Sequence, residues 1–223
     1  MSPRKILVLH SSAGAGHAQA AHAVRDALLE LDPGLDVPVA DSLQFSTPLF
    51  RRTYVASYNN MVARAPGLWG FLYRSTAHRR FDRGTALARL TFDRLSVVRL
   101  RAYLRRERPD AILVTHFLPL ALLSNLRLRK PELHPWPLYC VITDFTVHPF
   151  WVHAGVSCYF VSSENVVQEL AEQGVGADRV RVTGIPAHPR FARLGDPGEA
   201  RARLGLGREA PTVLVMGGGM GWG

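Results

Sequence analysis

A short apolar run, a turn of small residues and an amphipathic pattern follow one another at the start of the chain. Residues 6–9 are all apolar, which is typical of a strand covered on both faces of a parallel sheet. Residues 11–16 carry no bulky side chain, so the backbone can turn sharply and approach a ligand closely. From His17 onward the apolar residues recur at helical spacing. The unit therefore predicts a strand and a helix whose N-terminal amides favour negative charge at the turn.

The first turn of that helix carries a histidine, His17. A helix N-terminus disfavours the imidazolium form, so we expect a neutral ring near pH 7. A neutral imidazole that faces a cleft can act as a general base. The alternative is that His17 only caps the helix or bonds to a neighbouring loop. A nucleotide-binding turn on Gly14 and Gly16 is another alternative, although Gln19 stands where a dinucleotide fingerprint has its third glycine.

Strand-like runs alternate with helical patterns along the rest of the chain. We expect strands at 35–40, 110–115, 137–143, 157–161 and 180–183, and helices at 86–106, 117–129, 163–173 and 196–204. This alternation predicts a doubly wound parallel α/β sheet, in which ligands bind beyond the carboxyl ends of the strands. The conspicuous polar residues follow those ends: His10, His17, Asp41, His116, Asp144, His148 and His153. Their convergence predicts a cleft at that edge of the sheet.

The loop at residues 144–153 also raises the question of a metal. Asp144, His148 and His153 match no strong ligand signature. Pro149 prevents them from sharing one helical face. We therefore expect no metal site.

Residues 47–83 form a basic and aromatic segment within a chain of net charge +9. Pro66 and Gly67 should divide it into two helices. Arginine and aromatic side chains on amphipathic helices suggest contact with an anionic membrane surface, whereas the alternative is a surface helix whose aromatics lie in the core. Nucleic acid is not expected, because there is no reader motif and the patch is local. The residues assigned to membrane contact are Arg51, Arg52, Tyr54, Trp69, Phe71, Arg74, Arg79 and Arg80.

Three motifs occur in the order found in a known group of enzymes. They are SSAGAGH at residues 11–17, VITDFTVHPFWVH at 141–153 and VTGIP at 182–186. In these motifs the chain resembles the diacylglycerol glycosyltransferases of glycosyltransferase family 28, which include monogalactosyldiacylglycerol synthases and processive diacylglycerol glucosyltransferases. Cys158 is a departure, because many members have an aspartate there. The resemblance implies the Rossmann-like N-terminal half of a GT-B glycosyltransferase, with two such domains facing a cleft.

The resemblance also implies roles for individual residues. His17 would be the base toward the acceptor hydroxyl, and Asp144 or His148 would orient His17 or the acceptor as part of the catalytic group. The remaining substrate-binding residues would be Gly14, Ala15, Gly16, His116, Phe145, Trp151 and His153.

A division of the chain follows from the same resemblance. Residues 1–191 would form the acceptor-binding domain and residues 192–210 a linker. Residues 211–223 would be the first strand and glycine-rich turn of a truncated donor domain, with Gly217, Gly218 and Gly219 left from its donor loop. The rest of that domain would need about 150 more residues. We therefore expect a UDP-sugar to serve as a co-substrate, bound mainly by a domain that this chain lacks, and no cofactor.

The implied function is transfer of a hexose from a UDP-sugar to diacylglycerol, with inversion, in glycolipid synthesis. The alternative is a truncated, catalytically inactive domain that binds lipid or membrane. The expected partners are diacylglycerol, anionic membrane lipids and, for a split enzyme, a separate C-terminal half. The chain shows no signal-peptide pattern and has two cysteines without metal-ligand spacing. We expect a peripheral protein at the cytoplasmic face of a bacterial plasma membrane.

Overall fold

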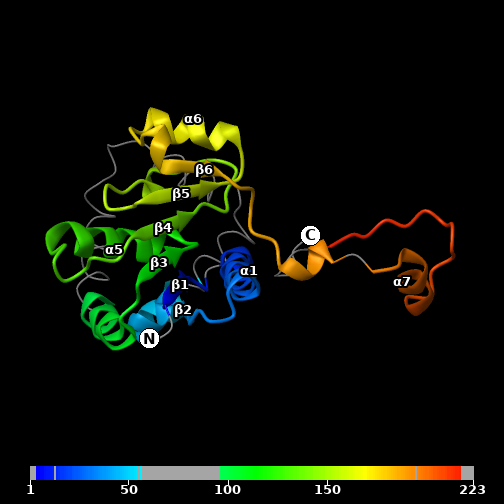
Figure 1. The fold of residues 1–223 in the computed structure, drawn as a ribbon, viewed down its shortest axis with the longest axis horizontal. Coiled ribbons are helices and arrows are strands. Elements are labelled where there is room, and N and C mark those ends of the chain that lie inside the picture. Colours follow the sequence, from blue (N-terminus) through cyan, green and yellow to red (C-terminus); the bar gives the residue numbers. More distant parts are fainter. Residues whose placement is uncertain (1–3, 13, 55, 57–95, 194, 217–223) are drawn as a thin grey trace.

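Six parallel strands form one sheet in the order β2-β1-β3-β4-β5-β6 (Figure 1). The computed structural model describes residues 4–12, 14–54, 56, 96–193 and 195–216. The strands are β1 (Ile6–His10), β2 (Val39–Asp41), β3 (Ala111–Val114), β4 (Leu138–Val141), β5 (Cys158–Val161) and β6 (Val180–Val182). The parallel sheet with its flanking helices confirms the predicted Rossmann-like α/β fold.

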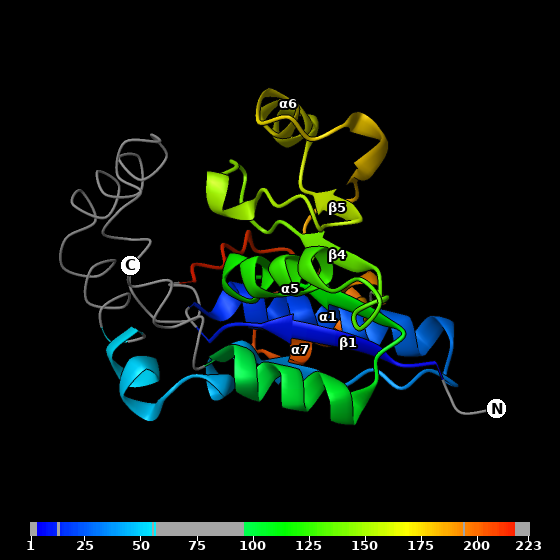
Figure 2. The same cartoon turned by 90° about the vertical axis from the view of Figure 1, so that its left-hand side faces the viewer.

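Helices cover both faces of this sheet. α1 (Ala15–Leu31) lies on one face, and α5 (Phe117–Arg129) lies on the other (Figure 2). The side chains of β1 show the two layers, because Leu7 and Leu9 join the apolar cluster of α5 while Val8 joins the cluster of α1. A helix over residues 96–107 and α6 (Glu164–Glu172) contribute to the same cluster as α5. The alternation of side chains along a strand thus produces two separate layers of core.

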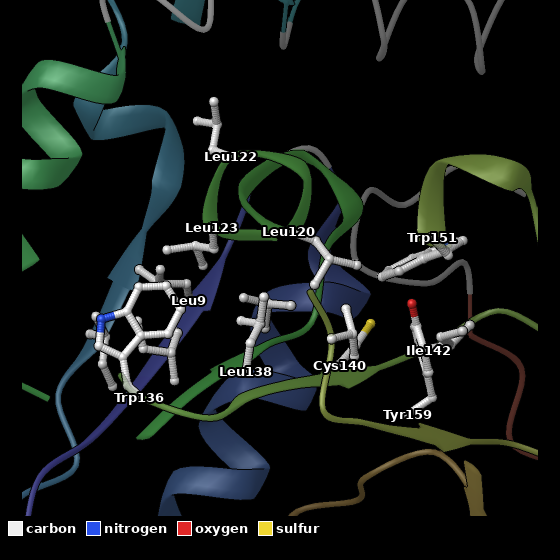
Figure 3. Close-up of a cluster of buried hydrophobic side chains, with 14 of the residues drawn as sticks. Leu9, Leu120, Leu122, Leu123, Trp136, Leu138, Cys140, Ile142, Trp151 and Tyr159 are labelled. Atoms are coloured by element: carbon white, nitrogen blue, oxygen red, sulfur yellow. The ribbon is translucent and has the colours of Figure 1, made fainter. Parts of the chain in front are cut away.

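The larger cluster also anchors the loop that follows β4. Trp151 in this loop is 1% exposed. Figure 3 shows its ring above Ile142 and Tyr159 and near Leu120 of α5. The loop therefore rests on the core at the carboxyl edge of the sheet.

The sheet reverses its order at β1. From β1 the chain runs outward to β2, and it then crosses to β3 on the other side of β1. Leu9 of β1 pairs with Val114 of β3, and the amide of Thr115 donates to the carbonyl of Leu9 at 3.0 Å. The turns after β1 and β3 consequently open side by side at the switch point, where open α/β sheets bind ligands.

Two expected elements differ from the structure. The strand predicted at 35–40 is shorter, because Pro38 has no amide hydrogen and regular pairing starts at Val39. Residues 211–216 form no strand among the described residues, and their apolar side chains are exposed, Val213 to 84%. A strand needs a neighbour to satisfy its backbone, and no strand of the described residues pairs with this segment. The first part of the helix predicted at 86–106 lies outside the described residues.

Short helices connect the remaining parts. They are η1 (Ser42–Phe45), η3 (Pro149–Trp151), η4 (Ala177–Arg179), η5 (Pro189–Ala192) and α7 (Pro197–Arg203). Two polar contacts hold the η5 connector against α1: Nε2 of His188 lies 2.8 Å from the Asp26 carboxylate, and Arg193 forms an ion pair with Glu30 at 2.8 Å. α7 stands away from the sheet (Figure 1). In the part of the chain that is described, none of the helices has the length and apolar character needed to span a bilayer.

Candidate active site

The turn between β1 and α1 is held open by its backbone and by the end of β2. Gly14 has a φ of 96°, which favours glycine. A Cβ added to Gly16 would meet no atom within 4 Å, so the fold itself leaves space there. One carboxylate oxygen of Asp41 accepts from the amides of Ser12 at 3.1 Å and Leu43 at 3.0 Å. The small residues therefore expose the turn while Asp41 fixes its shape.

His17 lies in the first turn of α1 and reaches across to the carboxyl ends of β3 and β4. Its Nδ1 lies 2.7 Å from the carbonyl oxygen of Thr115 and 3.0 Å from the Oγ1 of Thr143. A carbonyl oxygen can only accept, so Nδ1 must carry the proton. In the neutral ring Nε2 then holds the lone pair. The hydroxyl of Thr115 also donates to the carbonyl of His17 at 2.8 Å, so two hydrogen bonds join these residues.

Aromatic rings surround the same imidazole. The ring of His116 meets that of His17 edge to face, with centroids 4.6 Å apart. Phe117 stacks on His116 at 4.3 Å, and Trp151 lies 6.2 Å from His17. Burial among these rings lowers the pKa of His17, while the nearby Asp144 carboxylate and the bond to Thr115 oppose the shift. Burial holds the pKa of His116 well below its ordinary value. The neutral imidazole expected at His17 is therefore favoured, with burial rather than the helix end as the leading cause.

The polar residues of the loop after β4 serve mainly the loop itself. The indole of Trp151 donates to Asp144 at 3.1 Å. The Nδ1 of His148 accepts from the amide of Phe150 and caps η3. The Nε2 of His153 lies 3.0 Å from the carbonyl oxygen of Phe150, and its amide donates to the hydroxyl of Tyr159. These bonds give the loop a fixed shape beside His17.

The contacts of His17 add two residues to the expected site. The sequence assigned the orientation of His17 or of the acceptor to Asp144 or His148, which stays a prediction, and in the structure the Nδ1 of His17 bonds to Thr115 and Thr143. Asp144 acts on His17 only through its charge. Both threonines directly follow or lie just beyond a buried strand, which is the one signal that could have identified them. The Thr115 carbonyl that accepts from His17 is a backbone group, so no side chain in the sequence could indicate this bond.

The residues expected to contact substrate fall into exposed and buried groups. In the turn after β1, Ala15 and Gly16 are exposed and Gly14 is partly exposed. In the loop after β4, Phe145 is 71% exposed. His116 and Trp151 are 2% and 1% exposed, so they form the floor under His17. Substrate contact by any of these residues remains a prediction.

Most of the expected membrane segment lies outside the described residues. This applies to Trp69, Phe71, Arg74, Arg79 and Arg80, and also to Gly217, Gly218 and Gly219 of the expected donor loop. Arg51, Arg52 and Tyr54 are described and lie on a helix over residues 48–54. Among the described histidines, cysteines and acids, no group of three or more is arranged to hold a metal ion.

Comparison with known proteins identifies the family. The family model described as monogalactosyldiacylglycerol (MGDG) synthase matches residues 17–187. The chain belongs to the MGDG synthase family. This range begins at His17 in the first turn of α1 and extends past β6, so it includes Thr115, Thr143 and the loop after β4.

Individual relatives in this family come from plants and bacteria. The chain is 32% identical to the chloroplastic MGDG synthase of Spinacia oleracea over 100% of its own length and 42% of that protein. It is 34% identical to the probable MGDG synthase 2 of Oryza sativa subsp. japonica, covering 99% of this chain and 47% of the relative. It is 29% identical to the processive diacylglycerol beta-glucosyltransferase of Bacillus cytotoxicus, covering 97% and 54%. The chain thus spans about half the length of the curated relatives it matches.

These relatives also correct the expected localisation. Proteins of Spinacia oleracea, Glycine max and Arabidopsis thaliana that match the chain are named as chloroplastic. The expectation of the cytoplasmic face of a bacterial plasma membrane is therefore contradicted. Relatives of this chain thus include proteins named for a plastid, so membership of the family does not by itself indicate a compartment.

Proposed function

We propose that this chain is the acceptor-binding half of a membrane-associated glycosyltransferase. The complete enzyme transfers a hexose from a UDP-sugar to diacylglycerol with inversion, and His17 is its base. The observation that carries the proposal is the bond between His17 Nδ1 and the Thr115 carbonyl. This bond leaves the Nε2 lone pair available at the switch point of the sheet. The names of the relatives, which describe MGDG synthases and a diacylglycerol glucosyltransferase, support the substrate class.

The proposed reaction is a single displacement. The sn-3 hydroxyl of diacylglycerol gives its proton to Nε2 of His17 as its oxygen attacks the anomeric carbon. The bond from that carbon to the diphosphate breaks, UDP leaves with the electron pair, and the configuration inverts. As His17 becomes imidazolium, its Nδ1–H bond to the Thr115 carbonyl strengthens, and the Asp144 carboxylate stabilises the new charge.

Membrane association belongs to the same proposal. Diacylglycerol lies in a bilayer, so the acceptor half must reach the lipid surface. Arg51 and Arg52 are exposed on the helix over residues 48–54, and Phe145 is exposed on the loop after β4. Exposed cationic and aromatic groups of this kind favour an anionic interface. The chain carries a net charge of +9, which acts in the same direction.

The decisive experiment removes the proposed base. Transfer from UDP-galactose and from UDP-glucose to diacylglycerol in vesicles is measured with the protein as its organism makes it, together with any separately encoded donor half. We expect His17→Ala to lower kcat by about 10²- to 10⁴-fold, the usual contribution of general base catalysis. The matched control is His22→Ala, which removes a histidine of the same helix that makes no bond to Thr115 or Thr143 among the described residues.

Two results would contradict the proposal. Wild-type turnover by the His17→Ala protein would remove the imidazole from the chemistry. Flotation of the unaltered protein with vesicles, without transfer from either sugar nucleotide, would favour the catalytically inactive lipid-binding domain instead.

A further inference from the structure

Two side chains at the C-terminal end of α6 hold one residue of the loop after β4. The Oε2 of Glu169 accepts from the amide of Val147 at 2.5 Å, and the Nε2 of Gln173, the C-cap residue, donates to the carbonyl of Val147 at 3.1 Å. The two side chains are one helical turn apart, so they lie on the same face of α6. Val147 is 9% exposed and belongs to the larger apolar cluster. This Val147 clamp, formed by Glu169 and Gln173, therefore supplies partners for buried backbone groups, as a neighbouring strand would.

A further bond attaches the same loop at Asp144. The hydroxyl of Ser162, between β5 and α6, donates to the carbonyl of Asp144 at 3.1 Å. Residues 144–147 are thus fixed at both ends by the unit of β5 and α6. Between these two points Phe145 is 71% exposed. Contacts from another part of the chain therefore determine where the Asp144 backbone lies, in addition to the bond that its carboxylate accepts from Trp151.

The position of the Asp144 carboxylate matters to His17 because it carries charge. This carboxylate opposes the lowering of the pKa of His17 that burial causes. The other titratable groups that face His17 are His10 at the end of β1 and His116 after β3, and burial lowers the pKa of both. Neither can become negative, so among these three neighbours only Asp144 favours the imidazolium form. The strength of this effect depends on the distance between the carboxylate and the ring.

We propose that Glu169 and Gln173 are positioning residues that keep the Asp144 carboxylate beside His17. They act through the backbone of Val147, and no hydrogen bond joins either of them to His17 among the described residues. The inference rests on the proposed function of His17 as the base, because the ring becomes positive when it takes the proton of the acceptor hydroxyl. A loop released from α6 would leave that new charge with less compensation.

The alternative is that the Val147 clamp serves only the folding of the loop. Loss of a partner for a buried backbone group lowers stability whichever role is correct. A denaturation curve therefore does not distinguish the two roles. Proton uptake by His17 does distinguish them, because it responds to the distance between the Asp144 carboxylate and the ring.

NMR titration of His17 tests the positioning role without any sugar transfer. The imidazole chemical shifts of the intact protein and its variants are followed as the pH is lowered, and His17→Ala identifies the signals of His17. Glu169→Ala removes the acceptor for the Val147 amide. We expect the midpoint of His17 to move to lower pH by at least about half of the shift that Asp144→Asn produces. Gln173→Ala, which removes an uncharged donor, should move the midpoint in the same direction.

Three comparisons separate the hydrogen bond of Glu169 from its charge. Glu169→Gln loses the charge but keeps an oxygen that can accept from the Val147 amide, so the midpoint should return most of the way to that of the unaltered protein. Glu172→Gln makes the same charge change at an exposed position of α6 and should leave the midpoint unchanged. In the Asp144→Asn protein, Glu169→Ala should cause no further shift, because the charge that it would displace is already absent.

Each outcome decides the proposal. A shift in Glu169→Ala that Glu169→Gln reverses, and that is absent in the Asp144→Asn protein, supports it. An unchanged midpoint, equal shifts in Glu169→Ala and Glu169→Gln, or an added shift in the Asp144→Asn protein would overturn it. Should Glu169→Ala fail to fold, Gln173→Ala gives the same comparison with and without Asp144→Asn.

The two proposals can fail separately. The titration measures proton uptake, so a negative result leaves the transfer assay of His17→Ala to decide the role of the base. Wild-type turnover by His17→Ala would remove the base, while a shifted midpoint in Glu169→Ala would still show that α6 positions the Asp144 carboxylate.

Discussion

Two neighbouring regions at the carboxyl edge of the sheet carry polar residues of similar kinds but use them differently. At the switch point beside β1 and β3, the imidazole of His17 is held from the ends of two strands, by Thr115 after β3 and Thr143 after β4. In the loop after β4, Asp144 and His153 bond mostly to partners within the same loop. The bonds of His17 thus join it to other strand ends and leave its Nε2 lone pair available, whereas the bonds of Asp144 and His153 fix the shape of their own loop.

Truncation of Trp151, which anchors the loop after β4 in the core, should give the largest loss of stability. Trp151→Ala deletes a side chain that is 1% exposed, and loss of a buried tryptophan costs about 3–5 kcal/mol of the free energy of unfolding. The measurement is urea denaturation followed by circular dichroism. Phe145→Ala, in the same loop but 71% exposed, should change stability by no more than about 0.5 kcal/mol. Similar losses in both variants would show that Trp151 does not anchor the loop.

The buried histidines at this edge of the sheet should make the stability of the protein depend on pH. Burial lowers the pKa of His10, His17 and His116 in the folded protein. Below the ordinary histidine pKa of about 6.5 the unfolded chain then binds more protons than the folded protein, so stability falls as the pH is lowered. Each such histidine contributes up to about 1.4 kcal/mol per pH unit.

A single substitution tests whether His116 contributes to that slope. His116→Asn keeps an acceptor for the amide of Leu118 at the start of α5 but cannot take up a proton. The free energy of unfolding should consequently fall less steeply between about pH 6.5 and 5 than it does in the unaltered protein. A slope identical to that of the unaltered protein would show that His116 does not titrate between the two states.

Removing the hydrogen bond between His17 and Thr143 distinguishes a positioning role of Thr143 from a role in substrate binding. Thr143→Val removes the hydroxyl 3.0 Å from His17 Nδ1 but leaves the Thr115 carbonyl in place. We expect kcat for hexose transfer to fall about tenfold with little change in KM, and stability to fall by about 1 kcal/mol. Thr183→Val is the control, because its hydroxyl bonds only to Gly184 at the end of β6. A rise in KM at constant kcat would instead assign Thr143 to substrate binding.

The elements that the sequence predicts correctly are those with a local pattern of apolar residues. Apolar periodicity was enough for the sheet, because Leu7, Val8 and Leu9 must alternate between two covered faces. It also placed α5, whose boundaries at residues 117 and 129 match the expected helix. The turn with His17 could be located because small residues and a change of period mark the end of a strand.

Other features depend on contacts that have no local pattern. The Thr115 carbonyl is a backbone group, and every residue has one, so only the fold reveals that it holds His17. Trp151 was expected to bind substrate from the family resemblance, which stays a prediction, and only packing shows that its ring is also part of the core. Residues 211–216 have a strand pattern, but a strand forms only beside another.

The smallest expected effect is also the most informative about the two regions. Asp144→Asn removes a charge near His17 and keeps an oxygen that can accept from the Trp151 indole. Stability should therefore change by less than about 1 kcal/mol. The carboxylate favours the imidazolium form, so its loss lowers the pKa of His17 further, and His17 stays unprotonated to a lower pH. The acidic limb of the pH–rate profile should move to lower pH, while kcat on the plateau falls less than about tenfold.

An orienting role for Asp144 would give a different result. A carboxylate that set the ring's tautomer would, when replaced, release Nδ1 and cost nearly as much rate as His17→Ala. The proton on Nδ1 is instead fixed by a carbonyl that no side-chain substitution can remove. A loss of kcat in Asp144→Asn as large as that in His17→Ala would therefore show that Asp144 takes part in the reaction. A shifted acidic limb with a nearly unchanged plateau would show that Asp144 affects His17 only through its charge.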